Sequence, residues 1–170
     1  MNKYLCRPVW IVSLTAVLIL LDQWTKYLAV RYLKGSEALS IVDGVFELRY
    51  LENRGAAFGI LQGQRAFFLV IAALVLAGVV WLFSRMSREE KFWPIRLIAV
   101  AVLAGAWGNM LDRMRLGYVV DFFYFRLINF PIFNVADIYV SVAMAALAVL
   151  IFFYYKDEDL ERMLPGRRRP

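Results

Sequence analysis

Two aspartates stand in apolar parts of the chain where a carboxylate is costly. Asp121 occurs in the stretch VVDFF, and no basic residue follows it until Arg126. Asp137 lies near the start of the apolar segment 133–155, with no cation within one helical turn. Poor hydration raises the pKa of a carboxyl group. We expect the loop that carries Asp121 to return to the start of the segment that carries Asp137. The two carboxyls would then lie close together, share a proton and titrate as a pair.

Such a pair supports several kinds of chemistry. It can activate water for peptide hydrolysis, with the ionised member taking a proton from water and the protonated member polarising the carbonyl. Paired intramembrane carboxylates also couple ion movement in transporters, although no inverted repeat is visible here. A Mg²⁺ site for lipid phosphoryl transfer would need a tighter acidic cluster. A scaffold or accessory subunit also remains open, and hydrolysis is favoured.

The residue inventory narrows the catalytic classes further. The chain has no histidine and a single cysteine, Cys6. This excludes Ser-His-Asp and Cys-His catalysis, histidine metal ligands and a cysteine metal cluster. A carboxylate pair that works on water requires none of these groups, and we expect neither a metal nor a cofactor.

Other polar residues have helical spacing near the ends of apolar segments. A charge inside a span costs roughly 2.5 to 3.5 kcal/mol, so side chains that share a helix side should face protein. The groups with this spacing are Asp22 and Lys26, then Asn109, Asp112 and Arg113, and finally Asn134 and Asp137. Asp22 and Lys26, at i and i+4, predict an ion pair with a structural role. For the triplet on the third segment, structural contacts between helices are as plausible as a part in catalysis.

The segment ENRGAAFG (52–59) adds three candidate substrate-binding residues, Asn53, Arg54 and Gly55. The small residues that follow allow close backbone approach, which suits packing against a neighbour or an extended peptide. A tight turn into the next span would explain the same pattern.

Membrane-spanning helices must bring these residues together. Of the 170 residues, 62% are hydrophobic, well above the roughly half that soluble domains use. Four segments can cross a bilayer core of ~30 Å, namely residues 9–30, 66–83, 95–113 and 133–155. The net charge of +6 lies largely at the ends and in one loop, so it indicates membrane orientation and not nucleic-acid binding.

The distribution of Lys and Arg predicts the orientation. An even number of crossings puts both termini on one side, where the ends, the loop 84–94 and the adjoining Arg96 carry eleven Lys or Arg against nine on the other side. We therefore expect cytoplasmic termini, a cytoplasmic tail 156–170, and periplasmic loops 32–64 and 114–132. Because the spans alternate in direction, the polar groups all fall at the periplasmic face.

The two periplasmic loops predict a small sheet and an interfacial segment. Asp43-Gly44 stands between β-formers and indicates a tight hairpin turn. After it, apolar residues alternate with Glu47 and Arg49, which predicts a strand with one apolar side. Loop 114–132 is aromatic and suited to the membrane interface. The predicted fold is an all-α polytopic membrane protein, one membrane domain over 1–170, with four transmembrane helices, a small periplasmic β-sheet and an interfacial loop.

Five motifs, in this order, resemble bacterial lipoprotein signal peptidase, also called signal peptidase II: LDQWTK, ENRGAAFG, GNMLDR, GYVVDFF and FNVAD. The likeness covers nearly the whole chain except the tail after Tyr155. It implies a metal-free aspartic endopeptidase of the bacterial inner membrane, with Asp121 and Asp137 as the catalytic pair. The supporting residues that match are Asp22, Lys26, Asn53, Asn109, Asp112, Arg113 and Asn134.

The resemblance also implies partners. Substrates would be diacylglyceryl-modified prolipoproteins, cut just before the modified cysteine, and globomycin-type cyclic peptides would inhibit. We expect a monomer that contacts membrane lipids, with the basic end RRRP at anionic headgroups. Asn134 is expected to bond Asp137 or the substrate. Arg113 and Asn109 are expected to hold substrate carbonyls or the loop that bears Asp121, and Asp112 to orient groups near Arg113 or to cap the helix end.

Overall fold

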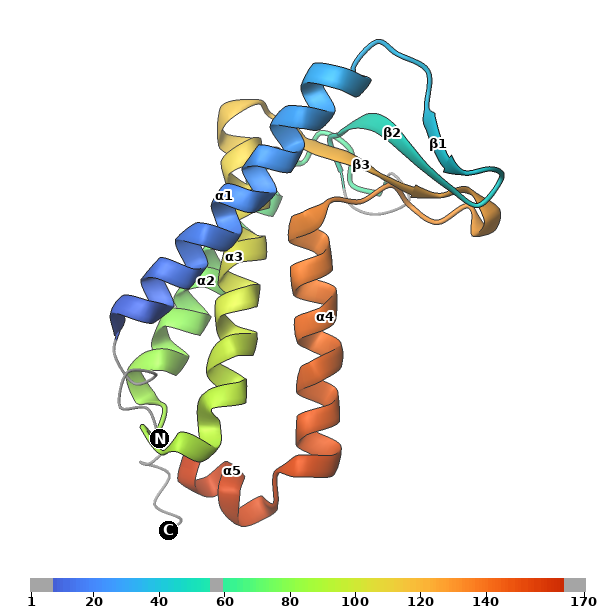
Figure 1. Cartoon of the computed structure of the whole chain (residues 1–170). Helices are drawn as coiled ribbons and strands as arrows, with labels where there is room; N and C mark the ends of the chain where they lie inside the picture. Colours follow the sequence, from blue (N-terminus) through green and yellow to red (C-terminus); the bar gives the residue numbers. More distant parts are fainter. Residues whose placement is uncertain (1–7, 56–59, 164–170) are drawn as a thin grey trace.

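The computed structural model describes residues 8–55 and 60–163. The basic end RRRP and residues 56–59 of the small-residue run lie outside these ranges. Figure 1 shows a bundle of long helices with a sheet at one end. The helices are α1 (Pro8–Leu33), α2 (Arg65–Arg85), α3 (Trp93–Arg115) and α4 (Val135–Val149), and the strands are β1 (Leu39–Val42), β2 (Phe46–Asn53) and β3 (Val119–Phe125). Shorter elements are η3 (Glu90–Phe92), η4 (Arg126–Ile128), the π-helix η5 (Leu150–Tyr154) and α5 (Asp157–Met163).

The four long helices have the length and composition of membrane spans. The spanning segments are Val9–Leu33, Arg65–Arg85, Glu90–Arg115 and Val135–Tyr154. Large apolar side chains stay exposed on their outer sides, as expected for helices that face lipid. The chain is therefore a multi-pass membrane protein, and the predicted combination of four membrane helices with a small sheet is confirmed.

Helix α3 packs against the other three long helices, and two of its glycines allow the closest approaches. A Cβ atom added to Gly105 would lie 2.6 Å from the carbonyl oxygen of Ala136 in α4. A Cβ atom added to Gly108 would collide with the carboxylate of Asp22 in α1. These glycines therefore set the distances at which α4 and α1 pack on α3.

Gly105→Ala is expected to destabilise the bundle by about 1 to 3 kcal/mol, because the added methyl group forces α3 and α4 apart. The measurement is thermal unfolding of the purified protein in detergent. Gly78→Ala is the matched control, since a Cβ atom at Gly78 in α2 meets nothing within 4 Å. An equal effect of the two substitutions would contradict the packing argument.

The predicted hairpin turn is confirmed. Val45 N donates to Val42 O at 2.9 Å, and Gly44 between them has a φ of +72°, which a side chain would disfavour. The apolar side of β2 is also confirmed, because Leu48 and Tyr50 pack on the cluster formed by the end of α1 and by β3. Glu47 departs from the alternation: it is buried, and Arg126 reaches it at 2.7 Å.

The segment 114–132 is not simply an interfacial loop, which corrects the expectation from sequence. Its residues Val119–Phe125 form β3, which pairs antiparallel with β2 in the sheet order β1-β2-β3. Residues 119–122 are all buried, so this part of the strand lacks the alternation that marks a strand with one solvent-facing side. The register pairs Asp121 with Leu51 of β2, and β3 also contacts α1 and α3.

Candidate active site

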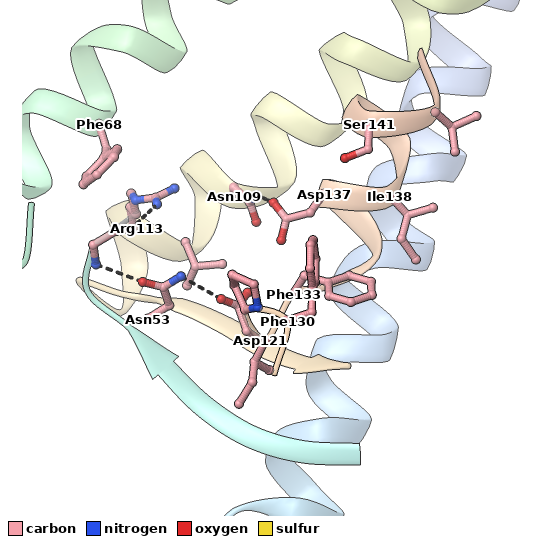
Figure 2. Close-up of a pocket in the computed structure, with 15 residues that line it drawn as sticks. Asn53, Phe68, Asn109, Arg113, Asp121, Phe130, Phe133, Asp137, Ile138 and Ser141 are labelled. Carbon is pink, nitrogen blue, oxygen red and sulfur yellow. Dashed lines mark hydrogen bonds between the residues drawn. The ribbon is translucent and has the colours of Figure 1, made fainter. Parts of the chain in front are cut away.

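A pocket of about 580 Å³ opens between α3, α4, β3 and the end of β2 (Figure 2). Its polar lining residues come from four elements and the segment after β2: Asn53, Gly55, Asn109, Arg113, Asp121, Asp137 and Ser141. Apolar side chains complete the walls, among them Phe68, Phe130 and Phe133. Both aspartates that the sequence analysis singled out face this one space.

Asp121 is held from two sides by asparagine amides. Its Oδ1 accepts from Asn134 Nδ2 at 2.6 Å, and its Oδ2 accepts from Asn53 Nδ2 at 2.8 Å. The side chain is almost fully buried. Burial raises the pKa of Asp121 to about 7, and the nearby Asp137 adds to the increase. The hydrogen bonds from the Asn53 and Asn134 side chains oppose it.

Backbone donors fix the orientation of both amides. Gly55 N donates to Asn53 Oδ1 at 2.9 Å, and Asp137 N donates to Asn134 Oδ1 at 3.1 Å. With each carbonyl oxygen engaged, each NH₂ group must point the other way, toward Asp121. The strand end and the helix start thus aim two N–H donors at one carboxyl group.

Asp137 belongs to the first turn of α4. Asn134 is the N-cap, and the two residues form a capping box in which Asn134 N donates to Asp137 Oδ2 at 3.1 Å. A carboxylate is favourable at this end of a helix. The cap engages one carboxylate oxygen, while Oδ1 accepts from Asn109 Nδ2 at 2.8 Å beside the pocket.

The two carboxyls are joined through a pair of asparagines. Asn134 Nδ2, which donates to Asp121, also lies 3.1 Å from Asn109 Oδ1, and Asn109 Nδ2 donates to Asp137. A continuous set of hydrogen bonds therefore connects Asp121 on the sheet with Asp137 on α4. Both carboxyl groups are thus held by one hydrogen-bond network at the wall of the pocket.

Behind this network, Lys26 lies buried between three acceptors. Its Nζ is 2.9 Å from Asp22 Oδ2, 3.1 Å from Asp112 Oδ2 and 2.9 Å from Asn109 Oδ1. An ammonium group has three N–H donors, so all of them are used. The pair along α1 that the spacing indicated is present, and it extends across to α3.

The two carboxylates at Lys26 also bind backbone N–H groups of other elements. Asp22 Oδ1 accepts from Ala136 N at 3.0 Å and so ties α1 to the first turn of α4. Asp112 Oδ2 accepts from Val120 N at 3.1 Å, which ties α3 to the strand of Asp121. Asp112 thus anchors β3, where sequence had suggested a helix cap or a partner for groups near Arg113.

Arg113 and Arg54 hold different positions relative to the pocket. Arg113 lines it, donates to Gly55 O at 3.2 Å and lies over the Phe68 ring at 4.5 Å, so it fixes the segment after β2 and not the strand of Asp121. Arg54 is exposed, pairs with Glu52 at 3.3 Å and is not among the lining residues. Gly55 is buried.

Three further residues complete the site and were missed from sequence. Gln23 Nε2 donates to Asp112 Oδ1 at 2.9 Å and lies between the two buried carboxylates. Ser141 lines the pocket one turn after Asp137. A signal existed for both, because Gln23 adjoins Asp22 and Ser141 is at i+4 from Asp137. Nothing in the sequence pointed to Phe68.

Comparisons with known proteins agree on one family. A family model described as signal peptidase (SPase) II matches residues 14–153. The lipoprotein signal peptidase of Brevibacillus brevis is 44% identical over 144 residues, which cover 84% of this chain and 95% of the relative. The lipoprotein signal peptidase of Streptococcus thermophilus is 39% identical over 153 residues, 90% and 97% of the two chains.

Solved structures share the fold. A bacterial membrane enzyme determined by the in meso method at 1.9 Å resolution has a TM-score of 0.72 and 26% identity, covering 85% of this chain and 94% of that one. A second such enzyme, at 2.3 Å, has a TM-score of 0.72 and 23% identity, with 94% and 93% covered.

Proposed function

The chain belongs to the signal peptidase II family of bacterial lipoprotein signal peptidases, and from this premise we propose the bond it cuts and the residues that cut it. The substrates are diacylglyceryl-modified prolipoproteins, and cleavage falls just before the modified cysteine. The proposal rests on one observation: Asp121 and Asp137 face a common pocket and are linked by two asparagines. The enzyme works as a monomer in the bacterial inner membrane, with cytoplasmic termini and the pocket near the periplasmic face.

In the proposed reaction the two carboxyls share one proton. The ionised carboxyl removes a proton from water, and the oxygen attacks the peptide carbonyl. The protonated carboxyl donates its proton to the carbonyl oxygen. When the C–N bond breaks, the leaving amine takes the proton that came from water, and a hydroxyl of the tetrahedral intermediate returns its proton to the other carboxylate, so the pair again holds one proton. A pKa of about 7 for Asp121 suits this sharing, because the proton is readily gained and lost near neutral pH.

The pocket walls suit an apolar peptide that enters from the bilayer. Phe68 and Phe130 supply aromatic surface, and Val142, on the outer side of α4, is 62% exposed. The pocket is thereby continuous with the lipid-facing side of α4. A signal peptide would reach the acids along this side while its diacylglyceryl chains stay in lipid, and a globomycin-type cyclic peptide would compete for the same space.

The direct test incubates the purified protein with a prolipoprotein that carries the diacylglyceryl group and with the same precursor lacking it. Mass spectrometry is expected to find a product that begins at the modified cysteine, from the lipidated precursor only. A chelator should leave the rate unchanged. Loss of activity with the chelator, or ion flux in proteoliposomes without any cleavage, would favour the metal or transporter alternatives.

Asn53→Ala is expected to move the alkaline limb of the pH–rate profile to higher pH. Activity needs the proton on the pair, so the rate should fall as pH rises through about 7, where Asp121 ionises. The Asn53 amide stabilises the ionised form and lowers the pKa of Asp121, so its loss raises that pKa further. The measurement is kcat/KM against pH.

Asn129→Gly is the matched control, since Asn129 accepts from Tyr124 outside the pocket and has a φ of +49° that glycine tolerates. It should keep the unsubstituted profile. An alkaline limb that stays in place in Asn53→Ala would mean that a group other than Asp121 controls it.

A further inference from the structure

The far end of the sheet carries exposed apolar side chains that belong to no spanning helix. They are Ile41 (55% exposed), Val42 (52%), Leu127 (70%), Ile128 (68%) and Phe130 (46%), which together form the apolar tip. Leu127 N lies 3.4 Å from Val45 O, so η4 sits beside the hairpin turn. Exposed apolar side chains gathered at one end of a sheet mark a contact with a partner or a membrane.

Two sets of contacts fix the level of the sheet relative to the bilayer. Phe133 and Phe123 exchange backbone hydrogen bonds at 3.0 and 2.9 Å, directly before the span that begins at Val135. Ala29 and Leu33, at the end of the α1 span, pack in one cluster with residues of β3. The sheet therefore lies at the ends of two spanning helices, where the membrane meets water.

The rim of the apolar tip has the composition of a membrane interface. Tyr124, whose hydroxyl donates to Asn129 at 2.8 Å, lies under the guanidinium of Arg49 at 5.9 Å from its ring centre. Arg126 is exposed and reaches Glu47. Tyrosine and arginine are favoured at this depth because each has an apolar body and a polar end.

The apolar tip continues into surface that already faces lipid. Phe130 contacts Phe133 edge to face, with ring centres 5.8 Å apart, and both line the pocket together with Ile138 and Val142 of α4. Figure 1 shows the strands extending sideways past α4 at this end of the bundle. Continuity with the lipid-facing side of α4 favours lipid as the occupant over a second protein.

We propose that the apolar tip inserts into the adjacent leaflet, at the boundary between phospholipid headgroups and acyl chains. The insertion would hold β3, and with it Asp121, at a fixed depth beside the pocket. The proposal goes beyond the proposed proteolysis, since a lipid contact at the apolar tip does not depend on which bond the pocket cuts.

Site-directed spin labels test the insertion. Leu127→Cys and Ile128→Cys are made singly in a Cys6→Ser background, labelled, and reconstituted in phosphatidylcholine vesicles. Collision with oxygen and with a water-soluble nickel chelate is measured by power saturation. Both labels are expected to collide at least threefold more with oxygen than a Glu37→Cys label, and at least threefold less with nickel. Glu37 is the control because it is exposed in the polar segment between α1 and β1.

Each other outcome overturns the proposal. Nickel access equal to that at position 37 would place the apolar tip in water. Shielding from both reagents would mean a protein occupant, and dipolar broadening between labels would identify it as a second copy of this chain.

A second measurement uses the double variant Leu127→Gln with Ile128→Gln, whose polar side chains disfavour insertion without placing a carboxylate next to the Arg126 peptide bond. Tryptic digestion of the reconstituted protein is expected to cut after Arg126 at least fivefold faster, because the lifted apolar tip becomes accessible. The double variant Leu127→Met with Ile128→Met keeps the apolar surface and should be cut at the unsubstituted rate. Equal rates for the two double variants would overturn the insertion.

Discussion

Asp121→Asn and Asp137→Asn are each expected to reduce cleavage of a lipidated precursor by about 10³-fold or more, because neither variant can hold the shared proton and also form the base. The substitutions keep the size of the side chain, and an asparagine oxygen can still accept from Asn134 or Asn109. The double variant should be no slower than the worse single variant, since two residues that act as one unit do not contribute independently.

The measurement is single-turnover cleavage by purified protein, with thermal unfolding to verify that each variant is folded. Asp43→Asn is the matched control: Asp43 lies exposed in the hairpin turn, where it accepts from Ser40 Oγ at 2.6 Å, and its loss should leave the rate unchanged. Normal cleavage by either site variant would disprove the aspartate pair.

Lys26→Met is expected to have the second largest effect. The Lys26 side chain is 3% exposed, and it neutralises Asp22 (0%) and Asp112 (3%) across two helices. Removing one partner of a buried ion pair leaves uncompensated charge and costs about 3 to 5 kcal/mol. The same change takes a donor from Asn109, whose amide holds Asp137, so the rate should also fall by more than tenfold.

Two comparisons separate the structural effect from the positional one. Lys34→Met removes an exposed lysine that pairs with Glu52 at 2.9 Å, and it should change stability little. Lys26→Met combined with Asp22→Asn should recover part of the lost stability, because one buried charge is removed, while the rate stays low. Recovery of stability and cleavage rate together in the double variant would show that Lys26 acts on stability alone. A fully stable Lys26→Met variant would contradict the buried network.

Local patterns explain what sequence predicted well. A backbone in lipid must satisfy its hydrogen bonds within one segment, so long apolar runs indicate helices and little else. The Asp43-Gly44 turn and the Asp22–Lys26 spacing also depend only on neighbours in the chain. Each appears in the structure because no distant element competes with it.

Contacts between distant elements could not be predicted in the same way. Residues 119–122 are all buried, so their sequence does not alternate between apolar and polar residues as a strand with one exposed side would. From sequence alone, this stretch could therefore be a strand or an interfacial loop. Asp112 meets Lys26 and Val120 only because α3 is rotated and positioned against α1 and β3. The predicted span 133–155 includes Asn134, whereas in the structure Asn134 caps α4, and the Asn-x-x-Asp spacing is a sequence signal for that cap.

The donors that face the two acids are neutral amides, from Asn53, Asn109 and Asn134. An amide keeps its charge state at every pH of biological interest, so a proton can pass between the carboxyls without breaking an ion pair around them. Lys26 is the nearest buried cation in the described network, and Asn109 lies between it and Asp137. The donors around the pair therefore keep their own charge at every protonation state of the pair, and the Asn53 and Asn134 amides favour the ionised form of Asp121.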